Sequence, residues 1–218
     1  MRLILISNFS DIQNEHYLLN LIFCEGLETY HLRKKNYSRD QMKAYIEKIP
    51  RYFHDRIVLH THFDLIHEYN LKGAHFTKAY THKDFKLEYP DHPYDFRHLS
   101  FSLHSIQEIK QIGSAYNYIF LSPIFDSISN TGYNSKFRIN ELKIFLADRD
   151  NRPEIIALSG ITDSKIFNIH ELGFDGLALL GHIWRHFEQD QQLIEAVNRF
   201  KKIKKLVHSV LEQQMKTA

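Results

Sequence analysis

The order of short apolar runs and helical stretches constrains the fold of this chain more than any other feature. Eight short runs are separated by segments with helical periodicity, and most of the runs are continuous rather than alternating. Continuous runs are typical of parallel strands that are buried on both faces. The predicted strands are Leu3–Ser7, Thr29–Arg33, Ile57–His60, Gly73–Phe76, His98–Ser102, Tyr118–Ser122, Ile155–Ser159 and Gly176–Leu180.

Helical patterns fill the intervals between these strands. Ser38 is an N-cap, Pro50 ends a helix, and Ser105 with Glu108 makes a capping box. The segment Thr81–Pro93 is polar and contains two prolines, so it is predicted to be a loop or a broken helix. The predicted helices are Asn14–Phe23 (with Tyr17, Leu18, Leu21 and Ile22 on one face), Gln41–Ile49, Ile106–Ile112 (followed by Gly113 as a C-cap), Asn140–Ala147, Lys165–Leu172 and Gln191–Gln214.

Eight strand-then-helix units in 218 residues predict an α/β fold, a single-domain (β/α)8 TIM barrel that spans residues 1–218. A doubly wound open sheet is the alternative. No Gly-x-Gly-x-x-Gly and no Walker sequence follows any predicted strand. The two common nucleotide-binding fingerprints of open sheets are therefore missing, which favours the barrel.

The composition excludes several classes of protein. Lys and Arg number 28 against 26 Asp and Glu, a balance that does not suit a dedicated nucleic-acid binder. The single cysteine, Cys24, excludes an intrachain disulfide framework and a multi-cysteine zinc site. No apolar run approaches the ~18 residues that a membrane helix needs. We therefore expect a cytoplasmic protein without membrane or nucleic-acid partners.

Two short turns after the last predicted strands indicate a phosphate site. The active site of a parallel barrel lies at the carboxyl ends of its strands. Ser159 and Gly160 follow the seventh strand, and Leu180 and Gly181 follow the eighth. Small residues there expose backbone N–H groups at helix N-termini, which bind phosphate. The alternative is that the two glycines only make tight turns.

Charged and titratable side chains follow other predicted strands. Arg33 and Lys35 leave the second strand on the same side and predict a cationic pair at the mouth, although a solvated basic run is the alternative. His104 follows the fifth strand. An imidazole there is suited to proton transfer, unless it only caps its own turn.

Fifteen histidines raise the question of a metal site. His60 and His62 form a His-x-His pair after the third strand, and a zinc ion would need further ligands, for which His31, His75 or His104 would have to converge. Because this spacing is a loose pattern, no metal site is predicted from it.

Six stretches of the chain, taken together in order, resemble the thiamine-phosphate synthase and TenI-like (thiazole tautomerase) superfamily. The resemblance runs from the first predicted strand to the last and covers nearly the whole chain. The stretches are His31–Lys35, Gly73–Phe76, Phe101–Ser105, Tyr116–Phe125, Ile156–Ile161 and Gly173–Trp184.

This resemblance implies a (β/α)8 barrel whose ligands belong to thiamine biosynthesis. The synthase branch joins an aminopyrimidine pyrophosphate to a thiazole phosphate with Mg²⁺, and the TenI-like branch isomerises a thiazole carboxylate phosphate without metal. By resemblance, Arg33 and Lys35 meet the pyrophosphate, and His104 transfers protons in the isomerase. The thiazole phosphate is expected at Ser159, Gly160, Leu180 and Gly181. Further candidate substrate contacts are His31, His60, Ser127, Ser129 and Asn130.

The chain departs from the synthase pattern where that branch binds Mg²⁺. An Asn-Asp pair after the third strand is replaced by His60-Thr61, and a second aspartate is replaced within Lys78–Tyr80. A lysine in the loop after the sixth strand has Asn130 as its nearest counterpart. Mg²⁺ prefers carboxylate oxygens, so it is expected only if synthase activity is retained. The candidate substitutes are Asp64, Asp84 and Asp126.

These observations support one main interpretation and two alternatives. The main interpretation is metal-independent, tautomerase-like chemistry on a thiazole phosphate, with His104 moving the ring proton. The alternatives are a thiamine-phosphate synthase with an altered Mg²⁺ site and a non-catalytic or regulatory protein that binds a thiamine precursor. We expect phosphorylated thiazole or pyrimidine ligands, and a homodimer is a possible assembly.

Overall fold

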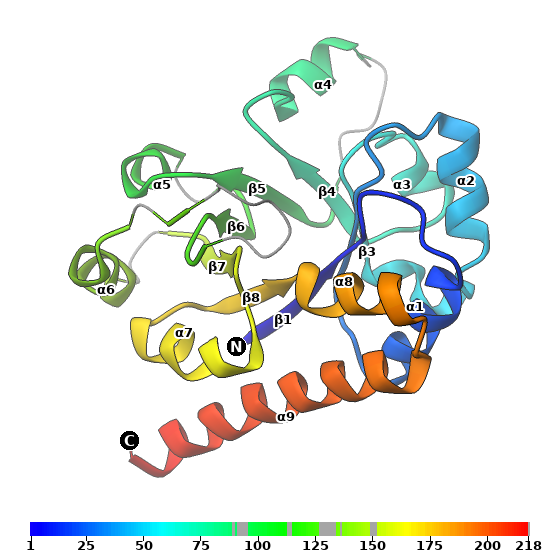
Figure 1. Cartoon of the computed structure of the whole chain (residues 1–218). Coiled ribbons are helices and arrows are strands. Elements are labelled where there is room, and N and C mark those ends of the chain that lie inside the picture. The colour runs from blue at the N-terminus through cyan, green and yellow to red at the C-terminus, as the bar shows by residue number, and fades with distance from the viewer. Residues whose placement is uncertain are drawn as a thin grey trace.

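Eight parallel strands close a barrel in chain order, with β8 pairing back to β1 (Figure 1). The structure, a computed structural model, describes residues 1–88, 90, 96–112, 115–126, 134–135, 137–148 and 152–217, with side chains up to residue 212. The strands are β1 (Arg2–Ile6), β2 (Tyr30–Leu32), β3 (Ile57–Leu59), β4 (Gly73–Phe76), β5 (Leu99–Leu103), β6 (Tyr118–Leu121), β7 (Glu154–Leu158) and β8 (Gly176–Leu179). Each predicted strand is therefore confirmed to within one residue at either end.

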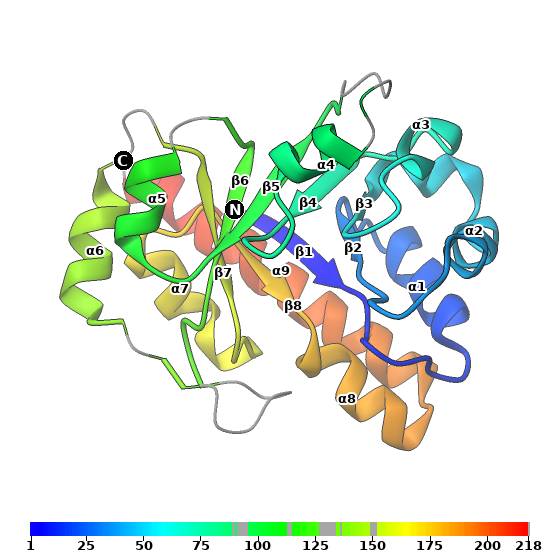
Figure 2. The same cartoon turned by 90° about the horizontal axis from the view of Figure 1, so that it is seen from above.

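Helices surround the barrel on its outside, as Figure 2 shows. The Ser38 capping box is confirmed, because the Ser38 hydroxyl accepts from the Gln41 N–H (3.2 Å) and the Gln41 side chain accepts from the Ser38 N–H (2.8 Å). The helices are α1 (Glu15–Cys24), α2 (Arg39–Glu47), α3 (Leu65–Glu68), α4 (His82–Glu88), α5 (Ile106–Ile112), α6 (Ile139–Ala147), α7 (Ile166–Leu172), α8 (Gly181–Asp190) and α9 (Leu193–Thr217), with 3₁₀ turns η1 (Arg51–Arg56) and η2 (Asp163–Lys165).

Two helical segments differ from the sequence prediction. Residues 82–88 form the regular helix α4, where a loop or a broken helix was expected. Thr81 caps its start: the Thr81 hydroxyl accepts from the Asp84 N–H (3.2 Å), and the Asp84 carboxylate accepts from the Thr81 N–H (2.6 Å). The terminal helix was predicted from Gln191, but Gln191 is left-handed (φ 53°) and ends a separate helix, α8. Gly113, the predicted C-cap of α5, lies outside the described residues.

The buried face of α1 is also different from the predicted one. Leu18 and Ile22 are buried as expected, but Tyr17 is 68% exposed and Leu21 is 43% exposed. Leu19 and Glu15 take their places on the inner side. The buried face of α1 therefore differs from the predicted one and includes the charged residue Glu15.

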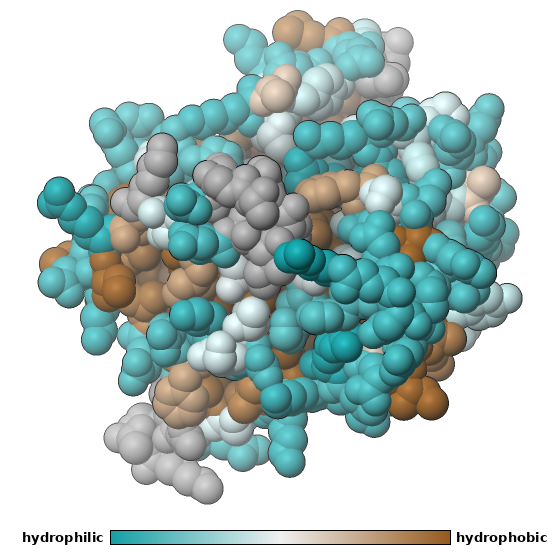
Figure 3. Space-filling view, viewed as in Figure 1, coloured by the Kyte–Doolittle hydropathy of each residue, from teal (hydrophilic) through white to brown (hydrophobic). Residues whose placement is uncertain are grey.

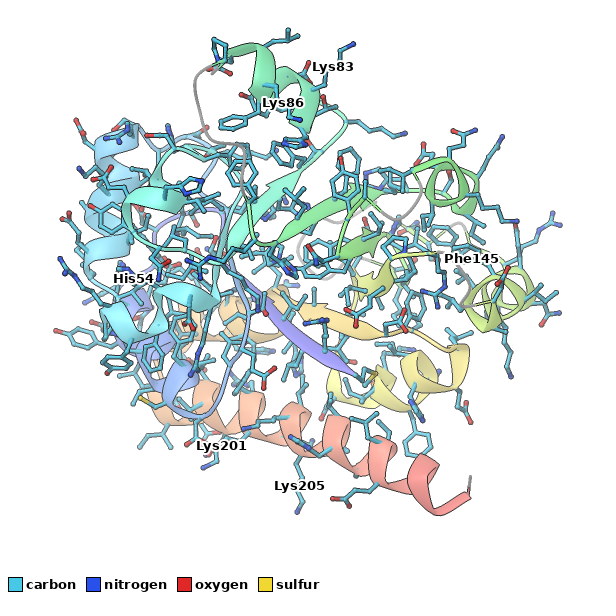
Figure 4. All side chains as sticks on the ribbon, turned by 180° about the vertical axis from the view of Figure 1, so that it is seen from behind. His54, Lys83, Lys86, Phe145, Lys201 and Lys205 are labelled. Atoms are coloured by element: carbon cyan, nitrogen blue, oxygen red, sulfur yellow. The ribbon has the colours of Figure 1, made fainter. Side chains whose placement is uncertain are left out.

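Helix α9 packs along the outside of the barrel across α7, α8 and α1 (Figure 1). Its lysines help to hold it there: Lys204 donates to the Glu25 carbonyl (2.6 Å), and Lys202 pairs with Asp163. Figure 4 shows Lys201 and Lys205 on the outer side of the helix. Some lysines of α9 thus face the solvent, and others bind the helix to the barrel.

Trp184, the only tryptophan of the chain, fixes helix α8 against strand β1. Its side chain is fully buried, and its indole N–H donates to the Ile6 carbonyl at 2.6 Å. Because Ile6 is the last residue of β1, this bond sets where the N-terminus of α8 meets the barrel rim.

The outer surface in the view of Figure 3 is mostly hydrophilic, with a hydrophobic patch over α6, the helix that carries the exposed Ile139 and Ile144. Within the described parts of the chain, no helix is both long enough and apolar enough to cross a bilayer.

Replacing Trp184 with Phe is expected to lower the free energy of unfolding by about 1–3 kcal/mol, because the buried Ile6 carbonyl loses its donor. Urea denaturation followed by circular dichroism measures the change. Tyr52→Phe, at a side chain that is 71% exposed, is the control and should change stability by no more than about 0.5 kcal/mol. Equal stability of the two variants would show that the indole bond does not fix α8.

Candidate active site

A cavity of about 790 Å³ opens at the carboxyl ends of the strands. It brings together most of the residues that the sequence singles out: Arg33, Lys35, His60, His104, Ser159, Gly160, Leu180 and Gly181. His31 does not line it, because that side chain lies fully buried below the cavity floor. Ser127, Ser129 and Asn130 lie outside the described residues.

One side of the cavity is cationic. Arg33, Lys34, Lys35 and Lys78 line it, and no carboxylate does so among the described residues. Lys34 and Lys78 have acidic partners outside the cavity wall, Glu15 and Glu108. Arg33 and Lys35 form no ion pair within the described ranges, so their charge is available to a ligand. This side therefore suits an anion.

Backbone contacts place Arg33 at the cavity mouth. Its N–H donates to the Ser7 hydroxyl at 2.8 Å, which ties the exit of β2 to the exit of β1. Its guanidinium carbon lies 4.9 Å from the centre of the Phe9 ring, within cation–π distance. Burial lowers the pKa of Arg33, but a guanidinium stays charged at any physiological pH.

Lys34 anchors the same loop through a buried ion pair that the sequence did not reveal. Its ammonium lies 2.7 Å from Glu15 Oε2 and donates to the Ser10 carbonyl at 2.7 Å, and both charged side chains are at most 3% exposed. Tyr45 donates to the other Glu15 oxygen (2.8 Å), and the Tyr30 and Tyr45 hydroxyls share a hydrogen bond. Burial raises the pKa of Glu15, and the ammonium of Lys34 opposes that rise.

Another part of the cavity wall presents backbone amides. Ser159 (φ 82°) and Gly160 (φ 67°) are both left-handed, and a Cβ on Gly160 would lie 2.4 Å from the Asp126 carbonyl oxygen. A non-glycine residue in this region is strained, which is typical of functional turns. The Ser159 hydroxyl is buried without a hydrogen-bond partner in the described structure.

Helix α8 begins at the same edge. Its N-cap, Leu180, provides no side-chain cap, and both Leu180 and Gly181 line the cavity. The first N–H groups of a helix have no partner within the helix, and its dipole favours a negative charge there. Together with the Ser159–Gly160 turn, this end of α8 can accept a phosphate group.

His104 presents its ring to the cavity rather than to its own turn. Ser105 caps α5, since its hydroxyl accepts from the Glu108 N–H (3.3 Å), while His104 Nδ1 lies 3.0 Å from the Ser122 carbonyl oxygen. A carbonyl only accepts, so the proton of the neutral ring is assigned to Nδ1. In that tautomer Nε2 carries the lone pair that a general base needs.

Three histidines meet at the floor of the cavity. His31 Nδ1 lies 2.9 Å from His60 Nε2, and the His60 and His75 rings stack with their centroids 4.3 Å apart. Burial lowers the pKa of His75 to about 3 and holds the pKa values of His31 and His60 well below their usual range. All three imidazoles are therefore neutral at physiological pH. His62 does not join them, because its ring bonds the Tyr37 carbonyl (2.8 Å).

The described residues at the cavity do not fit Mg²⁺, the ion that the synthase branch uses. A hard cation needs oxygen ligands, above all carboxylates. The three candidate substitutes have other partners: Asp64 pairs with Arg39 (2.6 Å), Asp84 belongs to the capping box of α4, and Asp126 accepts from the Ser135 N–H (3.0 Å). None of them lines the cavity.

Comparison with known proteins finds a family model that matches most of the chain. A family model described as thiamine monophosphate synthase (TMP-TENI) matches residues 3–183. The thiamine-phosphate synthase of Anoxybacillus flavithermus is 28% identical over 109 residues, which are 48% of this chain and 50% of that protein. The chain therefore matches about half the length of this curated relative.

Two solved structures extend the likeness to nearly the whole chain. The thiamine phosphate pyrophosphorylase from Bacteroides thetaiotaomicron is 31% identical, with a TM-score of 0.77 over 95% of this chain and 98% of that one. The thiamine phosphate pyrophosphorylase from Pyrococcus furiosus has a TM-score of 0.72 over 96% of each chain. Its identity is 13%, so it supports the fold alone.

Replacing Lys34 with Met is expected to lower the free energy of unfolding by about 3–5 kcal/mol at pH 8, because the Glu15 carboxylate stays buried without its cation. The folded-state pKa of Glu15 then rises further above its unfolded value. Such a carboxyl takes up a proton on folding as the pH falls, so the loss should be smaller at pH 5 than at pH 8.

Urea denaturation at the two pH values measures this difference. The matched control is Lys43→Met, which removes an ammonium that pairs with Glu68 at the surface (2.7 Å) and should give a much smaller loss. A loss at Lys34 that is equally large at both pH values would contradict the assignment of a buried, charged Glu15.

Proposed function

The chain belongs to the thiamine monophosphate synthase family, and from this premise we propose that it joins a pyrimidine pyrophosphate to a thiazole phosphate. The observation that carries the proposal is the presence of two anion-binding features in one cavity. The family match and the names of the Anoxybacillus flavithermus and Bacteroides thetaiotaomicron relatives support the same reaction.

The two features follow different strands of the closed ring. In that ring β1 separates β2 from β8, and β1 with β8 separates β2 from β7. Arg33 and Lys35 follow β2, whereas the Ser159–Gly160 turn follows β7 and Gly181 follows β8. Two phosphorylated substrates can thus bind with their anionic groups apart and their rings between them.

During the transfer, negative charge develops on the leaving pyrophosphate, which we place at the cationic side of the cavity. Release of pyrophosphate leaves a highly charged product, and fixed cations that meet it stabilise the transition state. Arg33 is held by Ser7 and Phe9, and the loop that carries it is anchored by the Lys34–Glu15 pair. The amide side meanwhile holds the thiazole phosphate and orients the ring for attack.

A second candidate is the metal-independent isomerisation of a thiazole carboxylate phosphate. His104 favours it, because Nε2 can remove a proton from one ring carbon and return it to another, with no net change in protons. The lack of carboxylates along the described cavity lining favours it too. Arg33 or Lys35 would then pair with the substrate carboxylate.

Two assays on one preparation separate these reactions. With both phosphorylated substrates, with and without Mg²⁺, formation of thiamine phosphate and pyrophosphate reports the transfer; with the thiazole carboxylate phosphate alone, proton NMR reports the isomerisation. We expect product in the first assay. Stabilisation of the protein by these ligands without turnover in either assay would instead indicate a non-catalytic binding protein.

His104→Asn refines this test. If the chain isomerises the thiazole, the variant should lose roughly 10²–10⁴-fold in rate, because proton transfer loses its general base. Transfer of the pyrimidine should change far less. His62→Asn is the matched control, since His62 lies outside the cavity and Asn tolerates its left-handed backbone (φ 54°).

Gly160→Ala tests the phosphate site directly. The added Cβ must displace Phe125 or the Asp126 carbonyl, so binding of inorganic phosphate should weaken by at least about tenfold, or ~1.4 kcal/mol. Gly26→Ala is the matched control, because Gly26 is also left-handed (φ 91°) but lies beside Lys204, away from the cavity. Calorimetric titration measures both variants, and equal affinity would rule the Ser159–Gly160 turn out as a phosphate ligand.

A further inference from the structure

The interior of the barrel is divided into an apolar half and a polar half. Strands β1, β6, β7 and β8 contribute Ile4, Ile6, Phe120, Ile156 and Ala178, which pack together with the Tyr118 ring. Strands β2, β4 and β5 instead contribute His31, His75 and Ser100, all at most 1% exposed. Barrel interiors are ordinarily filled by branched apolar residues. Buried imidazoles in that position therefore call for an explanation.

We infer that His31, His60 and His75 form a binding site for a divalent transition-metal ion of the Zn²⁺ class. One ring nitrogen from each residue lies within 4.8 Å of the others. The three come from β2, from the residue that follows β3, and from β4, which are adjacent strands of one rigid sheet. This site offers nitrogen donors in place of the carboxylates that Mg²⁺ prefers, and it goes beyond the proposed transfer reaction.

The donor set determines the class of ion. Imidazole nitrogen suits Zn²⁺, Co²⁺ and Ni²⁺, whereas Mg²⁺ requires oxygen ligands. Three histidines with one open position are a recurring arrangement for zinc that activates a water molecule or a substrate atom. His60 and His75 line the cavity, so the fourth position opens toward the ligand space.

Outer partners orient two of the three rings. His31 Nε2 bonds the Tyr118 hydroxyl, which directs Nδ1 toward His60. His75 Nδ1 lies 2.8 Å from the Ser100 hydroxyl oxygen, and that hydroxyl lies 3.4 Å from the Ala74 carbonyl, to which it can donate. Ser100 thus accepts from His75 Nδ1–H, and Nε2 carries the lone pair. Metal-binding histidines are held in this way by a hydrogen bond at the other nitrogen.

Binding exchanges two hydrogen bonds for metal–nitrogen bonds. In the metal-free chain one proton is shared between His31 Nδ1 and His60 Nε2, and His75 Nε2 bonds the Ser102 hydroxyl (2.7 Å). The ion takes the place of the shared proton, which moves to His60 Nδ1 as the ring changes tautomer. Neutral hydrogen bonds contribute only modestly to stability, so their loss costs little against the metal–nitrogen bonds that form.

Titration of the metal-stripped protein with Co²⁺ and then Zn²⁺ tests the site. We expect one Co²⁺ per chain, with the strong visible absorption of a four-coordinate ion, and displacement by Zn²⁺. His60→Asn should weaken Zn²⁺ binding by at least ~10-fold. His62→Asn is the matched control and should bind as the parent chain does, because its ring bonds the Tyr37 carbonyl instead.

Three results would overturn the inference: no uptake of Co²⁺, equal affinity of His60→Asn and the parent chain, or an equal loss in His62→Asn, which would place the ion at a surface pair. Where His60→Asn does not fold, Tyr118→Phe replaces it; this variant keeps the ring but removes the partner of His31, and its affinity should fall ~10–100-fold. The readout is binding, so it is independent of whether the chain transfers or isomerises.

Discussion

Closure of the barrel by β8 against β1 is the constraint on which the arrangement of the site depends. The pairing is parallel and in register from Arg2 and Gly176 onward. Gly176 lies where the two strands meet, and a Cβ on it would be 2.7 Å from the Arg2 carbonyl oxygen. The strands can approach this closely because residue 176 is a glycine. Once the ring is closed, all strand exits share one rim, and residues far apart in the chain face each other across a single cavity.

The cations at that rim differ in their partners. Arg33, Lys34 and Lys35 all line the cavity, but only the buried Lys34 pairs with a carboxylate, that of Glu15. One short basic run therefore supplies a structural ion pair and, beside it, two cations without an ionic partner among the described residues.

Much of the fold was predictable because continuous apolar runs report burial directly, and each strand was found where its run lies. The misassigned face of α1 has a physical cause: Glu15 is inside only because Lys34 neutralises it, and that pairing is long-range. The same applies to the site. The predicted ends of the strands indicated that Gly160, Gly181 and His104 belong to the site. The convergence of His31, His60 and His75 depends instead on the register between β2, β3 and β4, which no local sequence pattern encodes.

The position of Trp184 gives the molecule a built-in optical reporter. The chain has one indole, that of Trp184, which lies three residues after the first residue of α8. Its N–H donates to the carbonyl of Ile6, the last residue of β1. An anion that seats against the first turn of α8 changes the electric field along that helix and hence at the ring. Fluorescence of the unmodified protein is therefore expected to change when an anion binds at the first turn of α8.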